Sequence, residues 1–168
     1  MEKYSNRIAN SHDVILYLMV LMNYICSGEM KKYRNGIYRS VTSSREANLP
    51  ANIPDDVSTF INIWKNSSGA YCKYSDIKSH DLLKLDSYMH ITSPIRRLVD
   101  LLNIYKLQVN LGLAKFNGAV FYDSWISELE YINLSMRGIR KIQCDCDLLH
   151  LCSTNKKVLD EEYDGYVF

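Results

Sequence analysis

The chain has 168 residues, of which 20 are lysine or arginine and 19 are aspartate or glutamate, and its net charge is +1 at pH 7. This length supports one domain with a hydrophobic core, and 47% apolar with 23% charged residues is an ordinary composition for a folded soluble protein. The near-neutral charge excludes a general electrostatic attraction for nucleic acid, so such binding needs a local basic patch. Five unevenly spaced cysteines indicate reduced thiols and a cytoplasmic protein.

The first predicted element is a long apolar helix from Ser11, its N-cap, to about Tyr33. Its apolar part, Val14–Cys26, is too short to span a membrane and is interrupted by Asn23. No small-residue cleavage site of a secretory signal follows it. A buried core helix is therefore favoured, and no membrane partner is expected.

Short elements are expected in the middle of the chain. The pattern predicts a strand over 36–41, a polar connection over 42–54, a helix over 54–65, a turn over 66–69, an extended segment over 70–74 and a short helical turn that starts at Ser79 or Asp81. Beyond them it predicts a helix from Pro94 to about Gly112, a loop over 116–120, a long final helix capped by Asp123 or Ser124 and a strand over 163–168.

The final helix carries an apolar stripe at helical spacing that is expected in the core: Trp125, Leu129, Ile132, Met136, Ile139 and Cys146. Near its end stands a metal-like group of side chains: Cys144, Cys146, His150 and Cys152. Side chains two positions apart on a helix point in different directions, whereas zinc needs ligands that converge. Buried structural thiols are therefore favoured over a zinc site.

The most distinctive segment runs from Tyr88 to Leu102 and combines a helix start with two arginines. Ser93 is a good N-cap, and Pro94 suits the first helical position because its missing N–H has no partner there. The apolar residues that follow are spaced for a core-facing helix: Ile95, Leu98, Val99 and Leu102.

The unpaired N–H groups of such a first turn, the helix dipole and the hydroxyls of Thr92 and Ser93 favour an anion. Arg96 and Arg97 add planar donor forks that suit phosphate. This pattern is typical of a phosphate-binding helix start. The structural alternative is a surface ion pair between Arg96 and Asp100, which lie at positions i and i+4.

The same segment, Tyr-Met-His-Ile-Thr-Ser-Pro-Ile-Arg-Arg-Leu-Val-Asp-Leu, resembles the signature of the RNB exoribonuclease family, which includes ribonuclease II, ribonuclease R and the exosome nuclease. That signature reads approximately Tyr-x-His-x-Thr-Ser-Pro-Ile-Arg-Arg-Tyr-x-Asp-Leu. Four further segments resemble the family: Ser11–Asn23, Gly36–Arg39, Asn133–Cys146 and Asp164–Val167. The resemblance covers nearly the whole chain, but only the C-terminal half of the family's catalytic domain.

The resemblance implies an α+β fold, the helix-dominated half of an RNB-type catalytic domain with a few short strands. Residues 1–162 would form the C-terminal part of the RNB domain. Residues 163–168 would form the first strand of a following OB-type RNA-binding barrel.

The resemblance also implies removal of nucleotides from the 3′ end of single-stranded RNA with magnesium. Arg96 would be the catalytic arginine at the scissile part of the backbone. The candidate RNA-binding residues are Tyr88, His90, Thr92, Ser93, Arg97, Arg140 and Gln143. Alternatives stay open for some of them: His90 could be a structural histidine, and Arg140, with Arg137 and Lys141, could form a solvated helix face. Arg39, in the segment 33–45, belongs to another candidate basic patch.

Two departures from the family pattern concern catalysis. The family holds its metal in a motif of Asp-Pro followed by clustered aspartates, and this chain does not contain that motif. Leu98 replaces the Tyr of the signature, and Ile104 stands where a His often follows. The chain is therefore expected to be one of two things. It is either a fragment of a 3′-to-5′ exoribonuclease that works with the aspartate-bearing N-terminal half, or an inactive remnant that binds single-stranded RNA or a protein.

Overall fold

The structure is a computed structural model that describes residues 9–42, 53–55, 57, 58, 61, 69–115 and 117–162. Helices dominate the described residues, and their one sheet has two antiparallel strands, which confirms the α+β expectation at this coarse level. The elements are α2 (Ser11–Lys32), β1 (Ile37–Ser40), β2 (Ala70–Lys73), α4 (Leu98–Asn110), α5 (Ala119–Ser127) and α6 (Leu129–Thr154), with three short 3-10 turns at Tyr74–Asp76, Asp81–Leu83 and Lys156–Leu159. The predicted elements over 42–54, 54–65, 66–69 and 163–168 lie largely or wholly outside the described residues.

The first helix, α2, is capped by Asn10 and not by Ser11, because the Asn10 side chain accepts a hydrogen bond from the backbone N–H of Asp13 at 3.0 Å. Only its C-terminal half is a core helix. Its buried residues are Asn23, Cys26, Ser27 and Met30. Six apolar residues along the helix are exposed: Val14, Ile15, Leu16, Leu18, Met22 and Ile25. By length and composition alone, α2 could also cross a membrane.

The two-stranded sheet is held at both outer edges by asparagine side chains. The Asn103 side chain of α4 accepts from the Ile37 N–H and donates to the Ile37 carbonyl, both at 2.9 Å. The Asn133 side chain of α6 accepts from the Tyr71 N–H at 2.7 Å and donates to the Tyr71 carbonyl at 2.9 Å. Each amide therefore satisfies the outward-facing N–H and carbonyl of one edge residue, as a neighbouring strand would, and the edge of β1 is paired further where the Arg39 N–H donates to the Tyr88 carbonyl at 2.8 Å.

The chain enters β1 through a tight turn that only glycine allows. Gly36 has a φ of +99°, and a Cβ atom there would lie 2.8 Å from the Met30 Cε atom and 3.2 Å from that of Met89. Two groups of buried side chains pack around the sheet. One contains Ile37, Tyr71, Val99, Leu102, Tyr122, Leu129 and Ile132, and the other contains Cys26, Met30, Tyr38, Met89 and Ile91.

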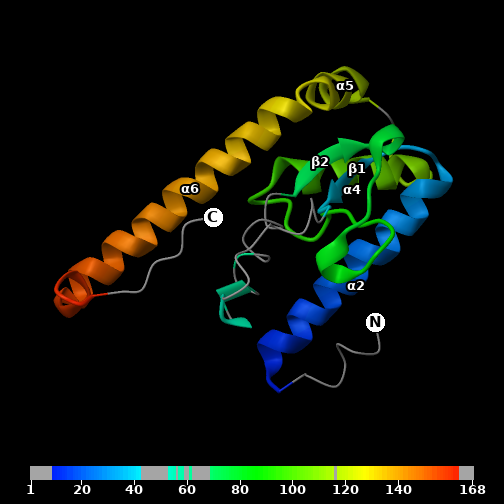
Figure 1. The fold of residues 1–168 in the computed structure, drawn as a ribbon. Helices are drawn as coiled ribbons and strands as arrows, with labels where there is room; N and C mark the ends of the chain where they lie inside the picture. The colour runs from blue at the N-terminus through cyan, green and yellow to red at the C-terminus, as the bar shows by residue number, and fades with distance from the viewer. Residues whose placement is uncertain are drawn as a thin grey trace.

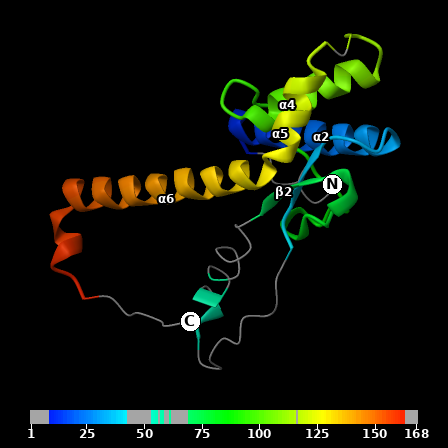
Figure 2. The ribbon, with the colours of Figure 1, turned by 90° about the horizontal axis from the view of Figure 1, so that it is seen from above.

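The predicted final helix is two helices, because the chain bends at Glu128 (φ −95°, ψ 20°) between α5 and α6. In Figures 1 and 2 the two helices run in different directions, and most of α6 extends away from the sheet. The predicted core stripe is confirmed only in part. Leu129 and Ile132 are buried and Trp125 and Met136 pack against them, whereas Ile139 is 57% exposed.

The cysteine prediction for α6 is wrong. Cys144 and Cys146 are exposed and Cys152 is half-buried, because the helix has by then left the body of the protein. Among the described residues, no group of three or more His, Cys, Asp or Glu side chains could hold a metal ion.

We predict that Asn103→Ala lowers the free energy of unfolding by about 2 to 4 kcal/mol, because the Ile37 N–H and carbonyl and the His90 carbonyl lose a buried partner. The matched control is Asn110→Ala on the same helix, whose half-buried amide pairs with Asn35. This change should cost less than about 1 kcal/mol. Urea unfolding followed by circular dichroism measures both, and equal losses would contradict a clamp at Asn103.

Candidate nucleic-acid interface

The signature segment forms a turn followed by a helix, so the prediction of a helix from Pro94 is wrong. Residues 94–96 form a turn in which the Ser93 carbonyl accepts from the N–H groups of Arg96 and Arg97, at 3.3 and 3.2 Å. Arg97 is extended (φ −136°, ψ 116°), and α4 begins only at Leu98. The extended backbone lets the Arg97 side chain turn back onto the first turn of the helix.

Asp100 is the reason for this geometry. Its side chain is fully buried and lies against the Arg97 guanidinium through two contacts, Nε to Oδ2 at 2.8 Å and Nη2 to Oδ1 at 2.9 Å. Its Oδ1 atom also accepts the backbone N–H of Ser93 at 2.8 Å. An acidic residue in the first turn that bonds back to the preceding backbone fixes the entry of the chain into a helix. Ser93 is therefore held by its backbone and does not cap the helix.

The ion pair at this helix start differs from the expected one. Asp100 pairs with Arg97, three residues before it, and Arg96 is exposed. Ile95, which was expected to face the core, is also fully exposed, because it lies in the turn and not in the helix. The two arginines therefore differ in their surroundings. Arg97 is paired with a buried carboxylate, whereas the Arg96 side chain is exposed at the surface.

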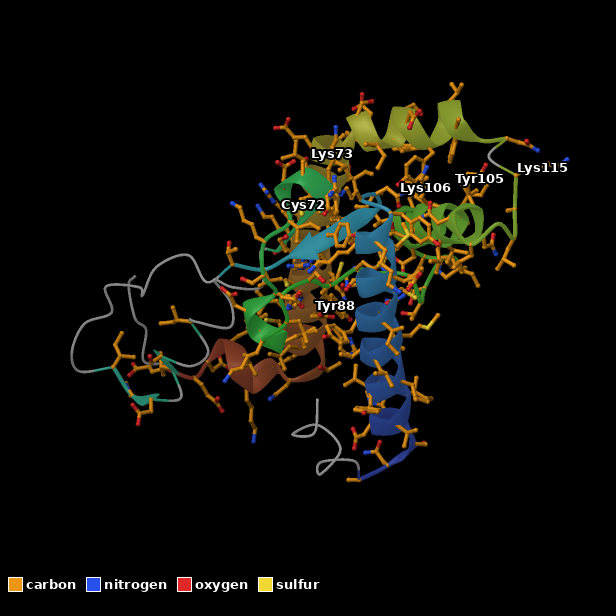
Figure 3. All side chains as sticks on the ribbon, turned by 90° about the vertical axis from the view of Figure 1, so that its right-hand side faces the viewer. Cys72, Lys73, Tyr88, Tyr105, Lys106 and Lys115 are labelled. Atoms are coloured by element: carbon orange, nitrogen blue, oxygen red, sulfur yellow. The ribbon has the colours of Figure 1, made fainter. Side chains whose placement is uncertain are left out.

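The loop before this turn is fixed to α2 by side-chain hydrogen bonds. The Asn23 amide donates to the Tyr88 hydroxyl at 2.8 Å, and its carbonyl oxygen accepts the Ile91 N–H at 3.0 Å. Ser27 on the next turn of α2 hydrogen-bonds to Ser87. Tyr88, which is labelled in Figure 3, is thus buried among these elements and does not present its ring for base stacking.

His90 and Tyr71 form a hydrogen-bonded pair beneath the arginines. The His90 Nδ1 atom lies 2.8 Å from the Tyr71 hydroxyl, and the two rings meet edge to face with centroids 5.7 Å apart. The guanidinium carbon of Arg39, from β1, lies 5.1 Å from the centroid of the Tyr71 ring, a cation–π contact. Two strands and a loop therefore bring Arg39, Tyr71 and His90 to one place.

Several nearby arginines act on the Tyr71–His90 pair through their charge, as the shifted pKa values of His90 and Arg39 indicate. Burial lowers the pKa of His90 to about 3, and the charges of Arg97, Arg39 and Arg96 contribute in the same direction. Burial also lowers the pKa of Arg39, and Arg140 and Arg97 lower it further. His90 is consequently neutral in the folded chain, and a local basic cluster exists in a protein with a net charge of only +1. We call Arg39, Arg96, Arg97 and Arg140 the arginine cluster.

Thr92 supplies a polar group beside this cluster. Its Oγ1 atom is buried and has no hydrogen-bond partner among the residues that the structure describes. A buried hydroxyl without a partner is rare in folded proteins and needs an explanation. Its sequence neighbours His90 and Ser93 already have partners.

Arg140 acts on the region from α6. Asn133 fastens this helix to β2, and Arg140 lies two turns further along, where its charge acts on Tyr71 and Arg39. Gln143 is exposed one turn beyond Arg140. A cleft of about 330 Å³ opens between β2 and the first half of α6, and Tyr71, Asn133 and Arg137 are among the residues that line it.

The described residues do not fit a magnesium site. Magnesium needs several converging oxygen ligands, and no such group of acidic side chains exists in the described part of the chain. Asp100, the carboxylate nearest the cluster in sequence, is occupied by Arg97 and Ser93. The site can therefore hold an anion through its arginines, but it does not by itself place a metal.

Sequence reasoning missed the residues that assemble this site. The signature pointed to Tyr88, His90 and the two arginines after it, but not to the Asp100–Arg97 pair or to the asparagines behind them. A detectable signal was present, because Asn23, Asn103 and Asn133 each interrupt an apolar helical stripe. A polar residue on a core-facing stripe is expected to bind a buried backbone group.

Comparison with known proteins adds no assignment. No protein-family model matches the chain, and no curated protein matches it. The function of the site must therefore be argued from its geometry and from the signature residues themselves.

We predict that His90 makes stability depend on pH in one direction. Its pKa is lowered from 6.5 to about 3, so the unfolded chain binds a proton that the folded chain rejects. The free energy of unfolding that depends on neutral His90 is therefore fully present above about pH 6.5. It falls on acidification, by up to about 1.4 kcal/mol per pH unit. Urea unfolding of His90→Gln between pH 4.5 and 7 should show a flatter pH dependence than the parent chain. The pKa of His80 is also lowered by burial, but His80 is present in both chains, so its contribution to the pH dependence cancels in the comparison. Parallel curves would contradict the prediction.

Proposed function

We propose that this chain is the C-terminal part of an RNB-type 3′-to-5′ exoribonuclease domain. It contributes the grip on the single-stranded RNA backbone and the catalytic arginine, Arg96. The observation that carries the proposal is the arginine cluster, which gathers around a neutral Tyr71–His90 pair in a chain that is otherwise balanced in charge.

The chemistry of the cluster suits a phosphodiester. Arg96 and Arg140 are exposed and supply planar, charged donors for phosphate oxygens, whereas Arg97 is paired with Asp100 and Arg39 is buried against the Tyr71 ring. His90 stays neutral and so adds no charge of its own, and Thr92 offers a buried hydroxyl that lacks a partner among the described residues. Because RNA carries a phosphate at every nucleotide, a chain of such contacts gives affinity without base recognition. The cleft beside Tyr71 adds no net charge to this surface, because Lys73 and Arg137 are balanced in its lining by Asp76 and Glu130.

In this proposal, Arg96 is the residue of the signature that acts at the reacting phosphate. It is exposed at the turn, while its neighbour Arg97 is held by Asp100. A fixed turn with one exposed guanidinium is suited to stabilise charge that develops on a phosphate oxygen. Arg97 supports this role by anchoring the turn, and it adds positive charge to the field at His90.

Magnesium belongs to the proposal only through another polypeptide segment. The clustered aspartates of the family pattern are not in this chain, so the metal would be held by the aspartate-bearing N-terminal half of the nuclease domain. The partners are accordingly single-stranded RNA and that half. The protein is proposed to act in the cytoplasm, where its thiols would stay reduced.

The second candidate function is an inactive remnant that binds single-stranded RNA or a protein. The observation that favours it is the position of the two departures from the signature. Leu98 and Ile104 pack against the two hydrophobic cores, so the signature helix puts apolar groups where the family carries Tyr and His. Binding through the arginine cluster would survive this change, whereas catalysis would lose polar groups.

We predict that Arg96→Ala and Arg140→Ala each weaken binding of a single-stranded RNA several-fold and reduce the slope of log affinity against log salt by about 0.7. Fluorescence anisotropy with a labelled oligonucleotide at several salt concentrations measures both quantities. The control is Lys156→Ala, an exposed lysine beyond the far end of α6 (Figure 1). RNA affinity that is undetectable at low salt in the parent chain would reject both RNA-binding functions.

We further predict magnesium-dependent shortening of a 5′-labelled RNA from its 3′ end when the aspartate-bearing half of an RNB domain is added as a separate polypeptide. Arg96→Ala should slow this shortening by about a hundredfold, because one charge-stabilising donor is lost. Gel analysis of the products measures the rate. RNA binding without shortening would favour the remnant over the nuclease, and shortening that Arg96→Ala leaves unchanged would exclude Arg96 from catalysis.

A further inference from the structure

The cleft between β2 and the first half of α6 is lined by charged side chains of both signs. Glu130 and Arg137 come from α6, whereas Lys73 and Asp76 come from the end of β2 and the turn that follows it. The volume of the cleft is about 330 Å³, which is at the small end of the range for ligand pockets. Because its two positive and two negative charges balance, the cleft itself does not favour an anion.

The side chains that α6 contributes to the cleft lie on one face of the helix. Glu130, Asn133, Leu134 and Arg137 are spaced by three or four residues in pairs, which is the spacing of neighbours on a helix surface. Glu130 and Arg137 are two turns apart, about 10 Å along the helix axis. The Asn133 amide between them is already bonded to Tyr71 of β2. The cleft therefore has a carboxylate toward one end and a guanidinium toward the other.

Apolar groups lie between these two ends. Tyr71 and Leu129 are buried, and Leu134 is 56% exposed. Ligand pockets combine apolar walls with a few polar groups that fix the orientation of the ligand. An exposed leucine between a carboxylate and a guanidinium therefore suits a flat ring that packs one face on the leucine and has both hydrogen-bond donors and acceptors at its edge.

The charged groups of the cleft are available to such a ligand. Lys73, Glu130 and Arg137 are exposed, and none of them forms an ion pair with another residue that the structure describes. The Asp76 carboxylate accepts the hydroxyl of its neighbour Ser75 at 3.1 Å. Glu130 and Arg137 are thus the carboxylate and the guanidinium on one helix face that a ligand can reach together.

The cleft adjoins the arginine cluster. Tyr71 belongs to both, because the guanidinium carbon of Arg39 lies 5.1 Å from the centroid of its ring. Arg140 lies one turn beyond Arg137, about 4.5 Å further along α6. A nucleotide whose phosphate is held at Arg140 would therefore have its base within reach of the cleft.

We propose that this cleft binds one base of the RNA and prefers guanine. The inference rests on the proposed function, which supplies the RNA strand. In single-stranded RNA the Watson–Crick edge of a base is open to side chains. Guanine presents two adjacent donors there, N1–H and the 2-amino group, which the two oxygens of the Glu130 carboxylate accept together. Its O6 and N7 atoms accept two hydrogen bonds from Arg137. Adenine, cytosine and uracil each offer a carboxylate only one donor group, so their pairing with Glu130 is weaker.

Matched RNAs test this preference on the full chain. The probes are labelled oligouridines that carry one central guanosine, adenosine or inosine, and inosine differs from guanosine only in lacking the 2-amino group. We expect the guanosine RNA to bind about tenfold more tightly than the adenosine RNA, because a bidentate contact discriminates between bases by about this factor. The inosine RNA should lose most of this gain. Fluorescence anisotropy measures the three affinities.

The variant Glu130→Gln tests the carboxylate. It should bring the ratio of guanosine to adenosine affinity close to one, because an amide has a single acceptor oxygen. The matched control is Asp147→Asn, the same loss of charge at an exposed position of α6 outside the cleft, and it should keep the ratio. Any general gain in RNA affinity from the lost negative charge cancels in the ratio. Circular dichroism confirms that both variants keep α6.

The outcomes separate this inference from the function on which it rests. Equal affinities for the guanosine, adenosine and inosine RNAs, or a preference that Glu130→Gln leaves unchanged, would overturn the guanine site and leave RNA binding in place. Arg96→Ala should weaken binding of all three RNAs and keep their ratios. If no RNA binds at low salt, the proposed function and the guanine site are both rejected.

Discussion

Three asparagine amides on α2, α4 and α6 hold this structure together. A ribbon of two short strands has two open edges, and it is at best marginally stable by itself. Here one amide from α4 satisfies the edge of β1 at Ile37, and one from α6 satisfies the edge of β2 at Tyr71. The third, Asn23 of α2, holds the loop that carries Tyr88 and Ile91. Helices and ribbon are therefore tied by directional bonds, which fix register as well as distance.

The candidate site inherits its order from these bonds. Asn103 also donates to the His90 carbonyl, so the same side chain that closes β1 positions the histidine beneath the arginine cluster. Asp100, one turn earlier on α4, neutralises one arginine and pins the turn that carries the other. A buried carboxylate that loses its arginine would be costly, which makes the pair a stringent constraint on the shape of the turn. The Asp100–Arg97 pair therefore fixes the shape of the turn, and the positive charge of the exposed Arg96 stays available for a ligand.

The sequence predicted the outline of the fold better than its details. The strands near 37–40 and 70–73 and the helical turn at 81–83 were found because glycine, aromatic and cap residues mark them locally. The start of α4 was missed because Ser93 and Pro94 satisfy the local rules for a helix start, whereas the decisive contact is a buried carboxylate seven residues later. The bend at Glu128 and the exposed end of α6 have no strong local signal either. The arginine cluster forms only when β1, the 90–97 segment and α6 come together in the folded chain. The spacing of residues along the sequence does not reveal which segments meet.

α6 is fastened to the sheet near its start, by the Asn133 amide and by the packing of Leu129, Ile132 and Met136, and this has a mechanical consequence. Asn133 lies near one end of a 26-residue helix, so the helix is a rod about 39 Å long that is fixed close to its root. Arg140 lies about 10 Å along the rod and the final residues about 30 Å along it. A tilt of about 10° at the root would therefore move the arginine by about 2 Å and the tip by about 5 Å. A tilt at the root of α6 therefore displaces the end of the helix about three times as far as the backbone at Arg140.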